Sequence, residues 1–267
     1  SELRQDIAYA WRLMWARPAF TAVIVATLAI GIGATSTVFT LVNAVLLRPL
    51  PYAEPDRLVL LAALSQRGVQ ISLSPRDYYD MTAAMPSVSS AAAFTNEQVT
   101  LTGGAEPERV DSVVVTWNFF DVLGAPPALG RGFVRGEGEA GNQRVVVISH
   151  GLWTRRFGAD PQTVGRDMMI DGRPYRIVGI APPSLVFLGR PEIWRPLVFT
   201  AHQLDPSQRG ARWIAVIARL APSVPPSRAD AEVRAIAERL AVDFPRTHHG
   251  RGATVRPLQD HLVRNTK

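Results

Sequence analysis

The chain has 267 residues, with 29 Lys and Arg, 23 Asp and Glu, and no cysteine. A chain of this length can form one large domain or two small ones around a substantial core. The absence of cysteine excludes disulfides, thiolate metal sites and a cysteine nucleophile. The net charge of +6 comes from scattered arginines, because Lys267 is the only lysine. This pattern permits attraction to anionic lipid headgroups and argues against a nucleic-acid partner.

Residues 1–17 predict an amphipathic helix that lies on a membrane surface. Their apolar side chains recur at helical spacing, with charged residues on the other faces. Trp11 and Trp15, four positions apart, suit the headgroup level, and the chain would turn into the membrane at Arg17. A short soluble helix is the alternative.

Residues 19–47 contain no charged side chain. An apolar helix of about 20 residues crosses a bilayer core of about 30 Å. We therefore predict one transmembrane helix over residues 18–48, which continues as a stalk and is ended by Pro49 and Pro51. A signal peptide is a weaker alternative, because its apolar region covers about 7 to 15 residues. A buried core helix is weaker as well, because cores seldom need so long an uncharged run.

Three small residues, Ala29, Gly33 and Thr37, recur every four positions and would share one face of this helix. Small residues at that spacing allow another transmembrane helix to approach closely. We therefore predict a helix-packing face along these three positions.

The charges that flank the apolar run predict its orientation. Arg4, Arg12 and Arg17 precede the run, and Arg48 and Arg57 follow it. Because basic residues are more frequent on the cytoplasmic side, this slight excess places residues 1–17 in the cytoplasm. The bulk of the chain is then extracytoplasmic.

Beyond the apolar run, hydrophobic periodicity and turn residues predict alternating strands and helices. The predicted strands are 57–65, 89–94, 98–103, 108–117, 145–149, 167–171, 173–181, 192–198, 212–220 and 252–258, and the predicted helices are 74–85, 118–124, 150–158 and 228–243.

Local signals support several of these elements. Ser74 is a predicted N-cap, and Gly124 is a predicted helix stop. Asp171 and Gly172 predict a tight hairpin, and residues 130–144, rich in glycine and charge, predict a mobile surface loop. Ser227 and Asp230 occupy capping-box positions at the start of the last long helix.

The order of these elements predicts an α+β fold in which two α/β segments flank a β-rich middle. The simplest arrangement is a split α/β domain with a small inserted subdomain. The predicted boundaries are 49–128 for the first half, 129–205 for the β-rich insertion and 206–262 for the second half.

The sequence contains none of the common catalytic motifs. It has no phosphate-binding loop, no nucleophile elbow and no zinc helix, and Gly-Arg-Gly at 130–132 lacks the rest of a dinucleotide fingerprint. An ATPase or a recognisable hydrolase is therefore disfavoured, and we expect no catalytic residue and no cofactor.

Two groups of titratable residues invite a functional interpretation. His248, His249 and His261 lie near the end of the chain, but no carboxylate stands beside them at metal-ligand spacing, so we expect solvated histidines and no metal. Asp77 and Asp80 could share a helix face, yet one is needed as a cap and both are expected to face water.

The aromatic residues favour a structural interpretation rather than a ligand box. The tryptophans expected to serve as core anchors are Trp117, Trp153, Trp194 and Trp213.

Three stretches of the sequence resemble one family. Residues 29–59, AIGIGATSTVFTLVNAVLLRPLPYAEPDRLV, are similar to the first transmembrane helix and its exit in FtsX-like, MacB-type ABC transporter permeases, in particular the duplicated orphan permeases. Residues 153–187 resemble a motif series of the periplasmic core domain, and residues 117–133 resemble a third segment. The positions that match the family's motifs, to which we assign structural roles, are Pro49, Pro51, Phe157, Gly158, Asp160, Pro161, Gly165, Arg166, Asp171, Gly172 and Gly179.

The resemblance implies a cytoplasmic amphipathic helix, one transmembrane helix that rises as a stalk, and a split porter-like domain with a β-rich insertion outside a bacterial inner membrane. It also implies mechanotransmission, in which ATP hydrolysis by a partner ABC ATPase moves the helices and the outer domains follow. The implied partners are the bilayer, that ATPase and a homodimer mate or paired permease half.

Family members continue into further membrane helices, whereas this sequence begins with Ser1 and reaches residues 263–267 about where the second such helix would start. The resemblance therefore predicts a truncated permease chain. The alternative function is a membrane-anchored binding or sensing module without transport activity.

Overall fold

The computed structural model describes residues 18–42, 52–103, 106–185, 187 and 189–260. The chain divides into two units, Ser1–Arg48 and Pro49–Lys267. The amphipathic helix predicted over residues 1–17 and the membrane-helix start predicted at 263–267 lie outside the described residues.

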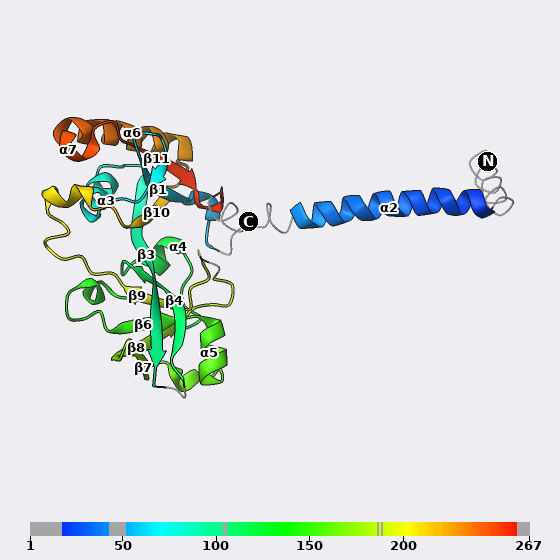
Figure 1. The fold of residues 1–267 in the computed structure, drawn as a ribbon, viewed down its shortest axis with the longest axis horizontal. Coiled ribbons are helices and arrows are strands. Elements are labelled where there is room, and N and C mark those ends of the chain that lie inside the picture. The colour runs from blue at the N-terminus through cyan, green and yellow to red at the C-terminus, as the bar shows by residue number, and fades with distance from the viewer. Residues whose placement is uncertain (1–17, 43–51, 104–105, 186, 188, 261–267) are drawn as a thin grey trace. The chain divides into compact units, whose positions relative to one another are not determined.

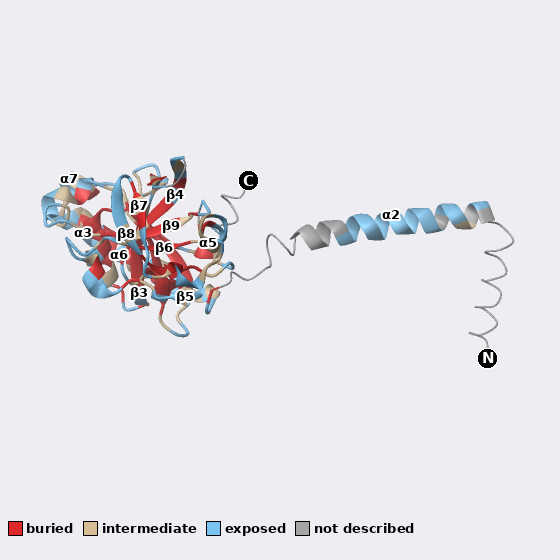
Figure 2. Cartoon of the chain, turned by 90° about the horizontal axis from the view of Figure 1, so that it is seen from below, coloured by how far each residue is buried: buried red, intermediate tan, exposed pale blue. Residues whose placement is uncertain are grey.

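The described part of the first unit is the helix α2, Pro18–Val42. Proline suits the first turn of a helix because its fixed φ is helical and its missing N–H would have no partner there. The hydroxyls of Thr27 and Thr35 donate to the carbonyl oxygens of Val23 and Gly31, each at 2.8 Å, so the helix itself satisfies them. Most of its described residues are exposed (Figure 2). Within the described parts of the chain, no helix combines the length and the apolar character that a membrane crossing requires.

The second unit is a mixed α/β fold whose described strands form one eleven-stranded sheet (Figure 1). The strands are β1 Leu58–Leu64, β2 Gln70–Ile71, β3 Val88–Thr102, β4 Glu108–Val115, β5 Leu129–Gly130, β6 Val145–Ile148, β7 Asp167–Ile170, β8 Arg173–Ile180, β9 Ile193–Pro196, β10 Ala215–Leu220 and β11 Gly252–Pro257. The helices are α3 Pro75–Ala83, α4 Phe119–Leu123, α5 His150–Phe157, α6 Pro226–Asp243 and α7 Pro245–His248, and the 3₁₀ turns are η2 Pro55–Arg57, η3 Arg135–Gly138, η4 Pro161–Thr163 and η5 Pro206–Gly210.

The main path of the sheet runs β11-β1-β10-β3-β4-β9-β6-β8-β5. Most neighbours are antiparallel, but β9 runs parallel to β4, and β6 runs parallel to β8. Strand β1 therefore lies between two strands from the end of the chain, β10 and β11. Segments about 150 residues or more apart in sequence thus build the same part of the sheet.

Strand β3 joins two parts of the sheet, with β11, β1 and β10 on one side and β4, β9, β6, β8 and β5 on the other (Figure 1). Its first half pairs with β10, and its second half pairs with β4 and β7. The sequence predicted two strands, 89–94 and 98–103, and that prediction was wrong. The polar residues between them stay in the strand because Asn96 and Glu97 pair with Val113 and Ser112 of β4, and because the Glu97 carboxylate pairs with Arg195.

Apolar side chains on both faces of the sheet are buried. On one face α3 and α6 pack against β1, β10 and β11, with Val233, Ile236, Ala237 and Leu240 of α6 buried as their spacing predicted. A second cluster gathers around α4 and includes Trp194. A third lies between α5 and the strands β6, β7 and β8. Figure 2 shows these buried residues in red.

The predicted helix ends give mixed results. Ser74 caps α3, because its Oγ accepts from the backbone N–H of Asp77 at 3.1 Å, and Gly124 ends α4 in the left-handed conformation, as expected. The capping box predicted at Ser227 and Asp230 was wrong, since Pro225 is the N-cap of α6 and no side chain caps it. Asp230 Oδ1 instead accepts from two donors of β11, Thr254 Oγ1 at 2.8 Å and the backbone N–H of Val255 at 2.9 Å.

The predicted loop 130–144 contains ordered structure. It begins with Gly130 of β5, which pairs with β8, and it includes the 3₁₀ turn η3. Glu137 is buried in this turn and pairs with Arg131 at 2.7 Å. The ion pair explains why a stretch rich in glycine and charge folds back onto itself.

Candidate functional site

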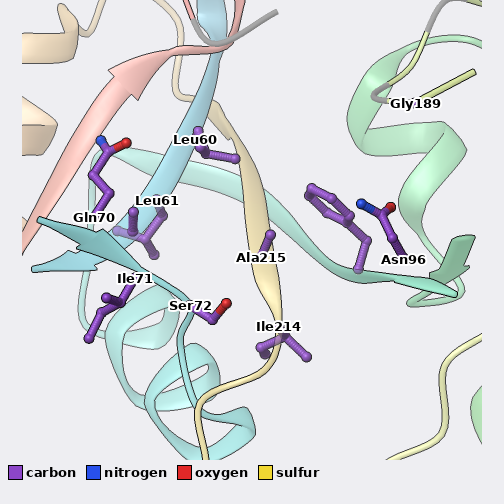
Figure 3. A pocket seen from close by; sticks show the side chains of 11 residues that line it. Leu60, Leu61, Gln70, Ile71, Ser72, Asn96, Gly189, Ile214 and Ala215 are labelled. Atoms are coloured by element: carbon purple, nitrogen blue, oxygen red, sulfur yellow. The ribbon is translucent and has the colours of Figure 1, made fainter. Parts of the chain in front are cut away.

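A groove of about 450 Å³ lies over β1, β2, β3 and β10 (Figure 3). Leu60, Phe94 and Ala215 contribute apolar surface to it, and Gln70 and Asn96 contribute side-chain amides. None of the described residues that line the groove carries a charge. The groove therefore has no group for proton transfer, but it can hold an uncharged apolar molecule and bind it further with two amides.

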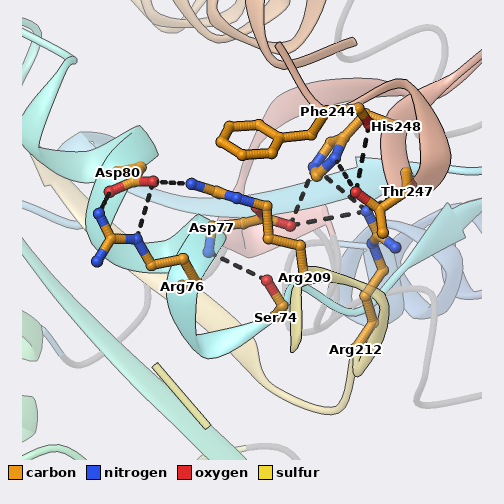
Figure 4. A network of polar contacts seen from close by, with 9 residues as sticks. All are labelled: Ser74, Arg76, Asp77, Asp80, Arg209, Arg212, Phe244, Thr247 and His248. Atoms are coloured by element: carbon orange, nitrogen blue, oxygen red, sulfur yellow. Dashed lines mark hydrogen bonds and ion pairs between the residues drawn. The ribbon is translucent and has the colours of Figure 1, made fainter. Parts of the chain in front are cut away.

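A second feature is a buried group of charged residues, which we call the Asp77 cluster: Asp77, Asp80, Arg209, Arg212 and His248 (Figure 4). Arg209 Nη1 lies 2.6 Å from Asp77 Oδ1, and Arg209 Nη2 pairs with Asp80. The guanidinium of Arg209 also lies over the ring of Phe244, 4.0 Å from its centroid. Asp77 and Arg209 are 1% and 2% exposed, so this ion pair is shielded from water.

His248 and Arg212 complete the cluster on the side of α7. His248 Nε2 lies 3.2 Å from Asp77 Oδ2, and Nδ1 lies 2.9 Å from Thr247 Oγ1. Arg212 Nη2 donates to the carbonyl oxygen of Thr247 at 3.2 Å and lies 3.7 Å from Asp77 Oδ2. The cluster thereby connects α3, the segment that contains η5, and α7.

Electrostatics explains why the cluster is stable while ionised. Burial acts to raise the pKa of Asp77, but the hydrogen bond and charge of His248, together with the hydrogen bond from Arg209, hold that pKa below its usual value of 3.8. Burial lowers the pKa of Arg212, and the charge of Asp77 opposes that effect. The cluster can therefore hold three segments of the fold together. Asp77, Arg209 and His248 are almost completely buried, whereas the Asp80 side chain is 28% exposed, so the centre of the cluster suits a structural role.

Two expectations about these residues were wrong. Asp77 does not face water, and His248 is 4% exposed rather than solvated. His249 is exposed as expected, and His261 lies outside the described residues. Among the described residues, no group of three or more His, Asp or Glu side chains is placed to hold a metal ion.

A third feature is the attachment of residues 52–57, just before β1. Arg57 Nε donates to the carbonyl oxygen of Leu220 at 2.9 Å, and Arg219 Nε donates to that of Val122 at 2.9 Å. Arg219 Nη1 also lies 3.8 Å from a carboxylate oxygen of Glu54. Arg57 thus ties the start of the domain to the end of β10, and Arg219 ties β10 to α4 and contacts Glu54.

The motif residues between 157 and 166 form a compact corner after α5. Gly158 ends the helix in the left-handed conformation, where glycine has no steric penalty. Asp160 accepts from the backbone N–H of Gln162 at 2.8 Å and pairs with Arg166 at 2.6 Å. The indole N–H of Trp153 donates to the carbonyl oxygen of Asp160 at 2.9 Å, so the corner is held against the helix.

The remaining motif residues of this region lie around β8. Asp171 and Gly172 both have positive φ in the turn between β7 and β8, as the hairpin prediction requires. Asp171 Oδ1 accepts from the backbone N–H of Thr100 at 2.9 Å. Gly179 lies where a side chain would overlap the carbonyl oxygen of Arg131, so only glycine allows this approach of the two backbones. In the corner itself, Phe157 is half-buried, Pro161 begins η4 and Gly165 has a φ of 93°.

Most of the predicted membrane positions lie outside the described residues. Trp11, Trp15 and Arg17 lie outside the described residues, as do Pro49 and Pro51, and the side chain of Thr37 is not described. Ala29 and Gly33 are exposed on α2.

The tryptophans differ in burial. Trp194 is fully buried, as a core anchor should be, whereas Trp117 is 36% exposed and that prediction was wrong. Trp153 and Trp213 are half-buried.

Sequence reasoning missed Arg209 and Arg212, which complete the Asp77 cluster from more than 130 positions away. Both lie in a polar stretch without a motif, so the sequence carries no signal for them. It also missed the groove, although Asn96 between apolar runs of β3 was a polar residue in need of a role.

Comparison with known proteins identifies the fold and the family model that fits the sequence. Residues 21–236 match the model described as MacB-like periplasmic core domain. No curated protein matches the chain.

Three solved structures have the same fold at 15–18% identity. One is the periplasmic region of MacB from Actinobacillus actinomycetemcomitans, with 16% identity, a TM-score of 0.55 and coverage of 79% of this chain and 92% of that one. Another is a domain of a putative permease protein from Porphyromonas gingivalis, with 18% identity, a TM-score of 0.56 and coverage of 78% and 93%. The third is the extracellular domain of the noncanonic ABC-type transporter YknZ from Gram-positive bacteria, with 15% identity, a TM-score of 0.53 and coverage of 74% and 99%.

Proposed function

Because the chain belongs to the MacB-like periplasmic core domain family, we propose that it is the extracytoplasmic portion, with the first transmembrane segment, of an ABC transporter permease in a bacterial inner membrane. The observation that carries this proposal is the family match over residues 21–236. The shared fold with the periplasmic region of MacB and the extracellular domain of YknZ supports it.

The proposed anchor rests on the sequence, in which residues 19–47 are uncharged. In this proposal residues 1–17 are cytoplasmic, and Trp11, Trp15 and Arg17 lie at the membrane interface. Ala29 and Gly33 would belong to the face on which another helix packs. The domain from residue 49 onward would be periplasmic.

The proposed mechanism is mechanotransmission without catalysis by this chain. A partner ATPase in the cytoplasm would hydrolyse ATP, and the movement would reach the domain through the segment before β1. Two contacts support this route, because Arg57 donates to the carbonyl oxygen of Leu220 at the end of β10, and Arg219 of β10 donates in turn to that of Val122 in α4. A displacement of that segment would therefore be transmitted to the centre of the sheet. The proposed partners are that ATPase and a second copy or paired permease half.

Labelling of single cysteines tests the topology, because the chain has no cysteine of its own. Gly136 is a suitable outer position, since it is exposed and a side chain there would meet no atom within 4 Å. We expect a membrane-impermeant maleimide to label Gly136→Cys in intact spheroplasts. It should label Gln5→Cys only after lysis.

Deletion of residues 18–42 is the control, and it should release the chain from the membrane fraction. If Gln5→Cys is labelled in intact spheroplasts and Gly136→Cys only after lysis, the periplasmic placement is wrong.

Oxidative cross-linking of single-cysteine variants tests the proposed mate separately. An absence of cross-linked dimers across a set of exposed positions would count against self-association.

The groove over β1, β3 and β10 favours a second candidate, a membrane-anchored binding or sensing module. Its uncharged lining suits a neutral apolar molecule. Two measurements with the purified chain separate the candidates: calorimetry of ligand binding and an assay of ATPase activity. Binding of a neutral apolar compound that Ala215→Trp abolishes would support the module, and ATPase stimulation by the chain would favour the permease.

A further inference from the structure

Strand β3 has an open edge beside the groove. On one side it pairs with β4 without interruption from Phe94 to Leu101. On its other side, β10 pairs with it only as far as Phe94, and β7 pairs with it only from Leu101 onward. Among the described residues, no strand pairs with residues 95–99 on this second side. A short stretch in the middle of β3 therefore has one strand neighbour instead of two.

The backbone groups of Asn96 and Gln98 point to this open side. The backbone N–H of Thr100 donates to Asp171 Oδ1 at 2.9 Å, and its carbonyl oxygen accepts from the N–H of Asp171 at 2.8 Å, so Thr100 faces away from β4. Backbone groups alternate between the two sides of an antiparallel strand. Those of Asn96 and Gln98 thus face the same way as Thr100, and within the described chain no loop or side chain bonds to them.

The groove lies at this edge, between β3 and β2 (Figure 3). Asn96 lines one bank, Gln70 and Ser72 line the other, and Ile214 and Ala215 lie between them. Ser72 is exposed, and none of its N–H, carbonyl and hydroxyl groups has a hydrogen-bond partner in the described parts of the chain. Unpaired backbone groups therefore line both banks of an uncharged groove.

The open edge lacks the usual protection against another strand. Exposed edges are commonly blocked by proline or by charged side chains. Residues 95–99 contain no proline, and their one charged side chain, Glu97, is already paired with Arg195. The Gln98 side chain is held by β4, because its Nε2 donates to Asp111 Oδ1 at 3.0 Å. The backbone of this stretch is thus available for pairing.

We propose that the groove binds an extended, uncharged peptide segment of a partner protein, which adds as a strand to β3. The backbone of that segment exchanges hydrogen bonds with Asn96 and Gln98, and alternate side chains lie on Ile214 and Ala215. An apolar molecule without a backbone would leave these N–H and carbonyl groups unpaired. This inference rests on the second candidate function, the binding module, and names the class of its ligand.

Hydrogen exchange of the 267-residue chain in uncharged maltoside micelles tests the open edge without any substitution. We expect the amides of Asn96 and Gln98 to exchange at least about tenfold faster than those of Thr95 and Glu97, which face β4. If all four amides are equally protected in dilute chain, the edge is covered and the proposal is overturned. Protection that appears only as the chain concentration rises would identify a second copy as the occupant and would also overturn it.

Calorimetry tests the ligand with acetyl-Thr-Val-Ser-Val-Thr-amide and two N-methylated forms of it. One form is methylated at the valine amides and the other at the threonine and serine amides, because only one alternate set faces β3. We expect the parent peptide to bind and to slow exchange at Asn96 and Gln98, and one methylated form to bind at least about tenfold more weakly. The proposal fails if the parent does not bind, if all three bind equally, or if these two amides stay fast.

Two substitutions at one position separate backbone from side-chain recognition. Asn96→Pro removes the N–H that faces the groove, and proline is tolerated at a strand edge. Asn96→Ala keeps that N–H and removes only the side-chain amide. We expect Asn96→Pro to weaken peptide binding at least about tenfold and Asn96→Ala less than about threefold. Equal effects would overturn strand addition. Circular dichroism checks the fold of both variants, and the methylated peptides need neither of them.

Cyclohexanol separates this inference from the candidate function on which it rests, because it is neutral and has no peptide backbone. Binding of cyclohexanol that Ala215→Trp abolishes, without binding of the peptide, would support the binding module and overturn strand addition. Binding of neither probe would contradict both. Binding of the parent peptide with the expected loss on methylation supports both.

Discussion

Asp77 Oδ1 and Arg209 Nη1 lie 2.6 Å apart in the interior of the domain, although 132 positions separate the two residues in the chain. The pair joins α3 to η5, and His248 extends the connection to α7. A buried charge that loses its partner costs much more than an exposed one, because water cannot solvate it. The stability of this domain should therefore depend strongly on the pair.

Replacement of Asp77 by Asn should destabilise the domain by about 3 to 5 kcal/mol, because Arg209 and Arg212 would be left without the carboxylate that faces both. Urea unfolding followed by circular dichroism measures this change. The control is Asp243→Asn, an exposed residue at the end of α6, which should change the free energy of unfolding by less than about 0.5 kcal/mol. Equal effects of the two substitutions would contradict the role of the pair.

The same residue predicts a pH dependence. The pKa of Asp77 is below 3.8 in the folded chain, because His248 and Arg209 overcome the opposing effect of burial. A depressed carboxyl pKa stabilises the fold above the unfolded pKa, and that contribution is lost as the pH falls through the folded pKa. We expect the free energy of unfolding to decrease below about pH 4, and to decrease less steeply in Asp77→Asn. Parallel curves for the two proteins would show that other carboxylates cause the acid sensitivity.

Replacement of Gly179 by Ala should separate β8 from the chain beside it, because a side chain at this position would overlap the carbonyl oxygen of Arg131. We expect a loss of about 1 to 3 kcal/mol, since the backbone must move to admit the methyl group. Gly136→Ala is the matched control, because that glycine has open space around it. Thermal unfolding of both variants measures the difference, and a Gly179→Ala variant as stable as the control would refute the close approach.

Replacement of Arg219 by Ala should loosen the segment that precedes β1. Its Nη1 donates to the carbonyl oxygen of Glu54 at 3.4 Å and its Nε to that of Val122, and the loss of a hydrogen bond from a charged donor costs about 1.5 to 3 kcal/mol. Hydrogen exchange should show faster exchange at Leu58 and Val59, with Val146 of β6 unchanged. Arg256→Ala, an exposed position on β11, should leave all three amides unaffected. Uniformly faster exchange would indicate global destabilisation rather than a local attachment.

Much of the secondary structure could be predicted, because the signals are local. The caps at Ser74 and Gly124 and the turn at Asp171 and Gly172 depend on residues a few positions apart. The same holds for the apolar spacing that buries one face of α6. Within the resemblance to MacB-type permeases, the motif residues from Gly158 to Gly179 also belong to one continuous stretch.

The wrong predictions concern residues whose partners lie far away in the sequence. Asp230 is predicted to cap its own helix, but its carboxylate accepts hydrogen bonds from two donors of β11 instead. Asn96 and Glu97 lie between two predicted strands, but pairing with β4 and the contact of Glu97 with Arg195 keep them in one strand. In each case the local signal was correct as a polarity pattern, and the tertiary partner determined what that polarity does.

The sequence by itself determined the uncharged run at 19–47, most of the longer strands and helices, and several of the turns and caps that connect them, because these depend on neighbours within a few residues. Only the tertiary structure decided which strands pair, and that Asp77, Arg209, Arg212 and His248 meet in the interior. It also decided that a groove forms over β1, β2, β3 and β10. A buried charge is stable only beside its partner, and the fold alone brings such partners together across more than 100 residues.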